Sequence, residues 1–161
     1  MEFILPKKKR IYKTFSETIG ITVPKIDEVL DYYYGGDHLP PIDSTSCYAL
    51  RTVITLDEVP TDIVNMLGNE KMVMKKSSER FEDCTRRGDF GKYVSRTGIP
   101  YYMKDEYKEI LKNSSNFYWT FYYHSNGDTI FFMGIYLPDY NYLYLYEYEY
   151  PAKNCQNVEY N

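Results

Sequence analysis

The hydrophobic positions in the first two thirds of the chain favour helices joined by loops. From Thr22 to Gly35, apolar residues recur at intervals of three and four positions, and Pro24 stands where a first-turn proline is tolerated. This spacing predicts an amphipathic helix over 22–35. Similar patterns predict helices over 57–67, 78–87 and 100–112, and a β-branched run predicts a strand over 48–56.

The C-terminal third alternates with a period of two, which is typical of strands. Strands are predicted over 116–125, 128–137 and 140–150, and Asn126-Gly127 is a strong two-residue hairpin signal between the first two. With these two residues as the loop, Trp119 lies opposite Gly134, whose missing side chain leaves room for the indole. The pattern predicts an antiparallel meander.

The last predicted strand carries tyrosine at every second position: Tyr140, Tyr142, Tyr144, Tyr146, Tyr148 and Tyr150. Because side chains in a strand alternate, these six share one face. The predicted pairing groups them with Tyr118, Tyr122, His124, Phe131, Met133 and Ile135. The other, core-like face holds Phe117, Trp119, Phe121, Ile130, Phe132, Leu143 and Leu145. A loop one residue longer after Pro138 would exchange the faces of the last strand.

These elements predict the α+β class: an antiparallel sheet that ends in a three-stranded aromatic meander over 116–150, with three or four helices packed against it. A chain of 161 residues is long enough for one core, so we expect a single domain over 1–161. Residues 1–13 carry five basic side chains and are predicted to form a basic N-terminal arm or edge strand. The segment Pro6–Arg10 also resembles a short nuclear-import signal, which leaves that alternative open.

Composition adds a charge and a compartment to this picture. The net charge is −4, which disfavours broad phosphate binding and favours a basic protein partner. Cys47, Cys84 and Cys155 form no CxxC pair, so neither a disulfide framework nor a zinc site is predicted. No apolar run approaches the roughly 18 residues of a membrane span, and we expect a cytoplasmic protein without membrane contact.

Tyrosine is the compositional outlier, with 20 residues in the chain. The tyrosine face of the last strand is either covered by the protein's own helices or forms a recognition surface. Coverage is favoured for the central tyrosines, and exposure for Tyr146, Tyr148 and Tyr150. A nucleic-acid stacking platform would need a basic groove beside the aromatic rings, and this end of the chain is acidic. The sequence therefore predicts a non-catalytic protein-binding protein of the inhibitor or immunity type. The predicted partner-binding residues are Tyr144, Tyr146, Glu147, Tyr148, Glu149 and Tyr150.

The alternative is a small enzyme that acts on a phosphorylated or nucleotide substrate. His124, beside the hairpin tip, would serve as acid or base with Tyr148 and Arg86. The other histidine, His38, has no second ligand at the spacing that a metal site needs, so no metal is predicted. No nucleotide-binding loop is present, and no cofactor is predicted.

One segment carries a family resemblance. The run from Glu17 to Pro24, followed by the predicted helix and by Gly35-Gly36, resembles the opening of SUKH-type immunity proteins. That family begins with an apolar-Gly-apolar-x-apolar-Pro segment, a helix and a glycine pair. The resemblance implies a non-enzymatic binder that neutralises a toxin by covering it.

Overall fold

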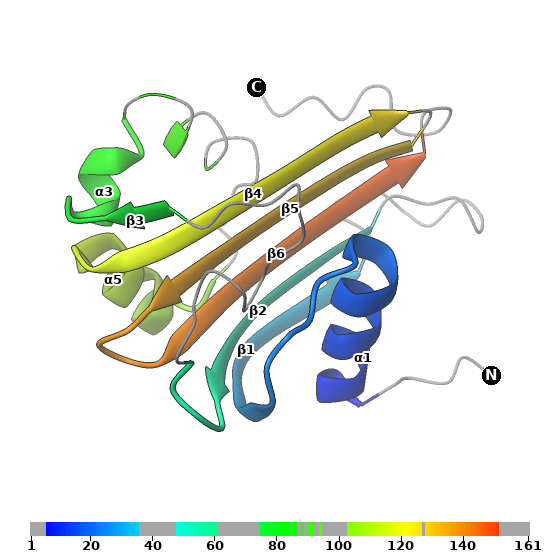
Figure 1. The fold of residues 1–161 in the computed structure, drawn as a ribbon, viewed down its shortest axis with the longest axis horizontal. Helices are drawn as coiled ribbons and strands as arrows, with labels where there is room; N and C mark the ends of the chain where they lie inside the picture. Colours follow the sequence, from blue (N-terminus) through cyan, green and yellow to red (C-terminus); the bar gives the residue numbers. More distant parts are fainter. Residues whose placement is uncertain are drawn as a thin grey trace.

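The computed structural model describes residues 6–35, 48–60, 75–86, 88, 90–91, 94, 103–126 and 128–151. They form a six-stranded antiparallel sheet in the order β1-β2-β6-β5-β4-β3, with helices packed against it (Figure 1). The strands are β1 (Ile26–Gly35), β2 (Tyr48–Leu56), β3 (Lys75–Ser77), β4 (Phe117–Asn126), β5 (Asp128–Leu137) and β6 (Tyr142–Pro151). The helices are α1 (Lys7–Lys13), the π-helix η1 (Thr14–Ile19), α3 (Phe81–Cys84) and α5 (Asp105–Asn113). The predicted α+β class and the C-terminal meander are confirmed.

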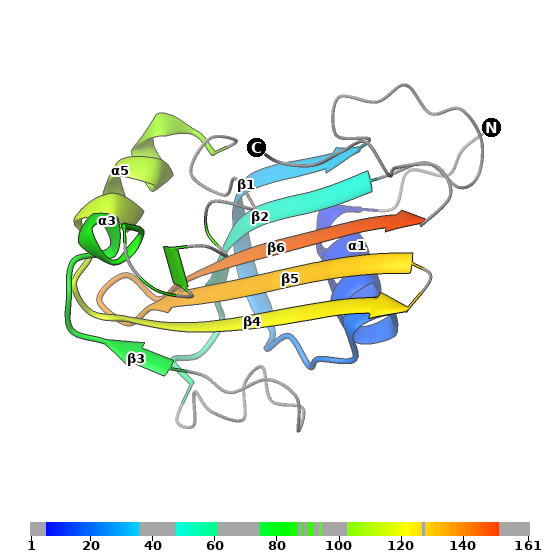
Figure 2. The same ribbon diagram turned by 90° about the horizontal axis from the view of Figure 1, so that it is seen from above.

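Two apolar clusters hold the helices to the sheet. Ile11 and Phe15, from α1 and η1, are fully buried against a cluster that includes Leu145. Tyr107 and Leu111 of α5 are buried in the other cluster, which includes the tyrosines of β6. In both ribbon views α1 lies at one end of the sheet and α3 and α5 lie at the other (Figure 2). Leu145 and Tyr144 are neighbours on β6 but belong to different clusters, so the two clusters lie on opposite faces of the sheet. Different parts of the chain therefore cover the two faces.

The helix predicted over 22–35 is wrong, because Ile26–Gly35 forms strand β1. The β1–β2 register shifts twice, between Ile26 and Glu28 and between Val29 and Asp31. Each bulge opposes two residues to one and interrupts the alternation of side chains. Apolar residues in such a strand fall at intervals of three and four, which is why the pattern favours a helix when it is read without the partner strand.

The predicted hairpin register is also wrong by one residue. Asn126 pairs with Asp128, and Thr120 rather than Trp119 lies opposite Gly134. A shift of one residue turns every side chain of a strand to the other face. Phe117, Trp119 and Phe121 therefore share the face of the tyrosines, whereas the predicted pairing of β5 with β6 is correct.

The basic N-terminal segment is a helix rather than an arm or an edge strand. Ile11 of this helix and Phe15 of the following η1 are four positions apart and enter the core together. Gly20, with a φ of 78°, ends η1 in the left-handed conformation that glycine tolerates best. Tyr12 then ties α1 to β1, because its hydroxyl accepts a hydrogen bond from Ile26 N at 2.7 Å and donates one to Pro24 O at 3.3 Å.

The remaining predictions are confirmed in part. Strand β2 has the predicted bounds, and α5 lies within the helix predicted over 100–112 apart from its last residue. Helix α3 has four residues where 78–87 was predicted. Residues 57–60 are not helical, and the rest of the helix predicted over 57–67 lies outside the described residues. Tyr140 and Asn141 belong to the turn before β6 rather than to the strand.

Candidate interaction surfaces

Four of the six predicted partner-binding residues on β6 are buried and form no surface. The exposed fractions are 0% for Tyr144, 1% for Tyr146, 0% for Glu147 and 0% for Tyr148. Strand β6 lies between β2 and β5, so it has a paired neighbour on either side and a covered face above and below. The side chains of Glu149 and Tyr150 lie outside the described residues. The expected exposure of Tyr146 and Tyr148 is therefore wrong.

The buried tyrosines of β6 instead contact helix α5 and the neighbouring strand β2. The hydroxyl of Tyr144 donates a hydrogen bond to the backbone oxygen of Tyr107 at 2.8 Å. Burial, above all, raises the pKa of Tyr144 well above its ordinary range. The buried guanidinium of Arg51 lies 5.0 Å from the ring centroid of Tyr146 and 5.2 Å from that of Tyr33. These rings have structural roles.

The strand register does not place His124 and Tyr148, two of the alternative catalytic residues, opposite each other in the sheet. His124 pairs with Ile130, and Ile130 pairs with Glu149, whereas Tyr148 pairs with Phe131, one residue out of step. Arg86 is exposed in the turn after α3. The side chain of His124 lies outside the described residues, so its role as acid or base stays a prediction.

Beside α3, the positive charge of Arg80 is partly neutralised by two carboxylates. Arg80 lies 3.2 Å from the Glu82 carboxylate and 3.6 Å from that of Asp83. An open hollow of about 300 Å³ nearby is lined by Ser77, Glu79, Cys84, Gly88, Phe90 and Trp119. The described part of this lining carries the carboxylate of Glu79, which disfavours a phosphate there.

A surface around α5, which we call the α5 surface, carries the carboxylates of Glu28, Asp31, Glu106, Glu109 and Asp139 and the ring of Tyr140, beside the helix's own Lys108 and Lys112. The backbone N–H of Lys104 donates to Asp31 Oδ2 at 2.8 Å and ties the start of α5 to β1. Burial raises the pKa of Tyr107, and the charges of Glu106, Asp31 and Glu28 raise it further. Carboxylates from β1 and α5 therefore lie around the same side chain, that of Tyr107.

Tyr140 is the exposed aromatic residue of the α5 surface. It is 48% exposed, and its ring centroid lies 5.4 Å from that of Tyr142. Asn141, with a φ of 53°, holds this turn in place. Its side chain accepts from the Tyr136 hydroxyl at 2.8 Å and donates to Leu56 O at 3.0 Å. The exposed ring thus stands on a turn that two hydrogen bonds fix.

Beside Tyr140 lies an open hollow of about 340 Å³, lined by Glu109, Ile110, Asn113, Ser114, Ser115, Asp139 and Tyr140. The side chains of Asn113 and Ser114 are turned back onto the carbonyl oxygens of Glu109 and Ile110, at 2.9 and 2.7 Å. Among the described residues of this lining, the charged groups are the carboxylates of Glu109 and Asp139. The hollow therefore favours a cationic group.

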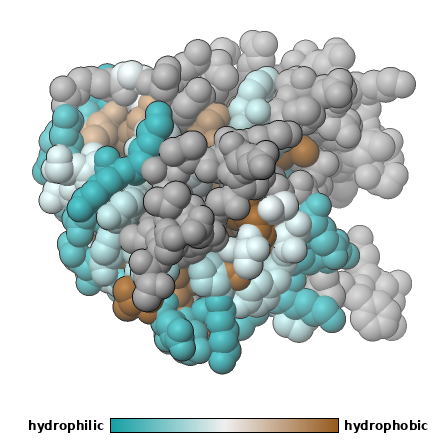
Figure 3. Space-filling model, in the orientation of Figure 1, coloured by the Kyte–Doolittle hydropathy of each residue, from teal (hydrophilic) through white to brown (hydrophobic). Residues whose placement is uncertain are grey.

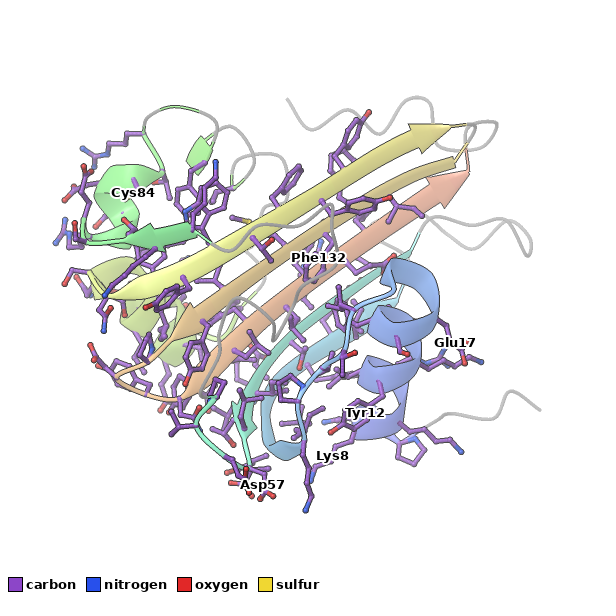
Figure 4. All side chains as sticks on the ribbon, viewed as in Figure 1. Lys8, Tyr12, Glu17, Asp57, Cys84 and Phe132 are labelled. Atoms are coloured by element: carbon purple, nitrogen blue, oxygen red, sulfur yellow. The ribbon has the colours of Figure 1, made fainter. Side chains whose placement is uncertain are left out.

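A basic surface, which we call the α1 surface, consists of Lys7, Lys8, Lys9, Arg10, Lys13, Tyr32 and Tyr34. Lys7 Nζ lies 5.4 Å from the Tyr32 ring centroid, and the Arg10 guanidinium carbon lies 4.4 Å from that of Tyr34. Tyr12 lies between α1 and the sheet, whereas Glu17 projects away from it (Figure 4). In the view of Figure 3, hydrophilic side chains lie along the left-hand, lower and right-hand edges of the described surface.

No helix in the described part of the chain combines the length and apolar character needed to cross a membrane. Within the same ranges, no three His, Cys, Asp or Glu side chains gather as metal ligands would. No family model, no curated protein and no solved structure gives a significant match to this chain.

Proposed function

We propose that this chain is a non-catalytic protein-binding protein that covers a basic partner with its α5 surface. The observation that supports this most is the exposed ring of Tyr140 beside the carboxylates of Glu109 and Asp139. Tyrosine is enriched among the residues that dominate binding energy at protein interfaces. This proposal keeps the acidic, tyrosine-bearing character expected from the sequence and moves it from β6 to the turn before it.

The α5 surface is prepared for binding before a partner arrives. Stacking on Tyr142 and the hydrogen bonds of Asn141 hold Tyr140 in place, so little side-chain freedom is lost in a complex. A partner's lysine or arginine that enters the hollow would meet the carboxylates of Glu109 and Asp139. Glu109 already lies 3.9 Å from Lys112 Nζ, which is a long and therefore weak ion pair.

Inhibition by covering is the activity that the SUKH-type resemblance implies. The segment that follows Pro24 is strand β1, whereas the family's opening has a helix there. The resemblance therefore stays a prediction, and the proposal of a protein-binding role rests on the α5 surface alone.

The test compares Tyr140 with a matched residue elsewhere. Tyr123 on β4 is also 48% exposed, so Tyr140→Ala and Tyr123→Ala remove the same ring from equally exposed positions. Proteins retained from source-cell lysate by the immobilised wild-type chain would be identified by mass spectrometry, and the affinity of a retained basic protein measured by titration. Loss of a central tyrosine at an interface costs about 2 kcal/mol, or roughly 30-fold in affinity.

We expect that loss for Tyr140→Ala and wild-type affinity for Tyr123→Ala. Glu109→Gln should weaken the complex more at low than at high salt, because its contribution is electrostatic. A retained partner that binds Tyr140→Ala normally, or that is acidic, would contradict the proposal.

A further inference from the structure

The α1 surface gathers positive charge that no ion pair within the described part of the chain neutralises. Among the described residues, none of Lys7, Lys8, Lys9, Arg10 and Lys13 forms an ion pair, although the chain as a whole has more acidic than basic residues. The first turn of α1 contains no acidic residue. Lysines at this end of a helix are opposed by its dipole, so the arrangement is unfavourable for the isolated protein. An anionic partner would reverse that cost.

The cations of this surface are interleaved with aromatic rings. Tyr32 and Tyr34 are two residues apart on β1 and pair with Thr52 and Leu50, so they point to the same side of the sheet, about 7 Å apart. Tyr34 is 39% exposed and stacks against Arg10. A row of rings beside a basic helix is the arrangement that stacks nucleobases while neutralising phosphates.

Two other anionic partners fit less well. A basic amphipathic helix that enters a membrane inserts its apolar side, but Ile11 and Phe15 are fully buried in the core. A carboxylate-rich protein would pair with the cations, but a carboxylate, unlike a nucleobase, has no extended flat face to stack on the Tyr34 ring. Nucleobases stack both on aromatic rings and on arginine guanidinium groups, which Tyr34 and Arg10 supply together.

We propose that the α1 surface binds single-stranded nucleic acid, with Lys9 and Lys13 on the phosphates and Tyr34 with Arg10 as the stacking platform. Lys9 and Lys13 are exposed and one helical turn apart, so both can follow one strand. This inference is independent of the α5 surface.

The test is fluorescence anisotropy with a labelled oligothymidylate of about 12 nucleotides, a length within the usual range of single-strand sites. Lys9→Gln/Lys13→Gln should weaken binding. It should also make the negative slope of log K against log salt shallower by about 1.4, because each of the two lost single-strand phosphate contacts contributes about 0.7. Lys104→Gln/Lys112→Gln changes the net charge equally on the α5 side and should leave both values unchanged.

Substitutions of Tyr34 distinguish binding of nucleic acid from binding of any polyanion. Tyr34→Ala should weaken binding about fivefold or more, whereas Tyr34→Phe, which keeps the ring and the fold, should bind like the wild type. Absence of binding at low salt would overturn the proposal. Equal competition by poly-L-glutamate together with normal binding by Tyr34→Ala would also overturn it and would assign the surface to an acidic protein. Tyr140→Ala should bind the oligonucleotide normally, so this test and that of the α5 surface fail separately.

Discussion

Thr52 and Thr120 are both buried, but among the described residues only the hydroxyl of Thr52 has a hydrogen-bond partner. Thr52 Oγ1 donates to the carbonyl oxygen of Asp31 at 2.8 Å, whereas Thr120 Oγ1 has no partner within the described part of the chain. Burying a hydroxyl without a hydrogen bond costs free energy, and valine has the same shape without that group.

We therefore expect Thr120→Val to raise the free energy of unfolding by about 1 kcal/mol and Thr52→Val to lower it by a similar amount. Urea unfolding of both variants gives the comparison directly. A loss of stability in Thr120→Val would mean that its hydroxyl is satisfied in solution.

Single residues also mark where sequence-based prediction stopped. The tyrosines of β6 were correctly assigned to one face, because alternation is a local property. Whether Tyr146 and Tyr148 meet solvent depends on β2 and on the second core cluster, and those contacts come from distant parts of the chain. Tyr140 was expected in the strand, and the prediction missed its exposed position because Asn141 turns the chain there.

At the scale of elements, the charges in the first turn of α1 are expected to have opposite effects on the stability of the fold and on nucleic-acid binding. Replacing Lys8 by Glu places a negative charge in the first turn, where the helix dipole favours it, and removes a cation from the α1 surface. We expect Lys8→Glu to raise the free energy of unfolding by about 0.5 kcal/mol and to weaken oligothymidylate binding in the same preparation.

Thermal unfolding and anisotropy measured together test this opposition. Lys8→Gln is the intermediate control, since it removes the cation without adding an anion. Tighter oligonucleotide binding by Lys8→Glu would contradict the assigned role of the helix.

Elements with a regular period were the predictable ones. Strands β2, β4, β5 and β6 and helix α5 lie close to their expected ranges, because each repeats its apolar positions without interruption. Strand β1 was mistaken for a helix because two bulges break its alternation. Helix α1 was missed because Ile11 is its one fully buried apolar residue, and the core that Ile11 enters is built by other segments.

For the molecule as a whole, buried tyrosines predict sensitivity to alkaline pH. Burial is the main cause that raises the pKa of Tyr107, Tyr136 and Tyr144 in the folded protein above the ordinary value of about 10. Their protonated forms are thus compatible with the fold, and their ionised forms are not. The stability linked to these groups is complete below the unfolded-state pKa and is lost as pH rises towards the folded-state pKa.

We expect the free energy of unfolding to fall above about pH 10, by about 1.4 kcal/mol per pH unit for each tyrosine that only the unfolded chain ionises. Urea unfolding at increasing pH measures this slope, and Tyr144→Phe should make it shallower by one tyrosine's share. Phenolate absorbance from all tyrosines before any unfolding would contradict the expectation.

The sequence by itself determined the fold class, the C-terminal meander and the shared face of the tyrosine row, because hydrophobic period and turn residues act over short stretches of chain. Only the tertiary structure decided that β6 is an interior strand, that Glu147 and three of its tyrosines are buried, and that the basic segment is a helix beside Tyr32 and Tyr34. The physical reason is that exposure depends on which distant segments pack together. In this chain the β2–β6 pairing and the docking of α1 join residues that lie far apart in the sequence.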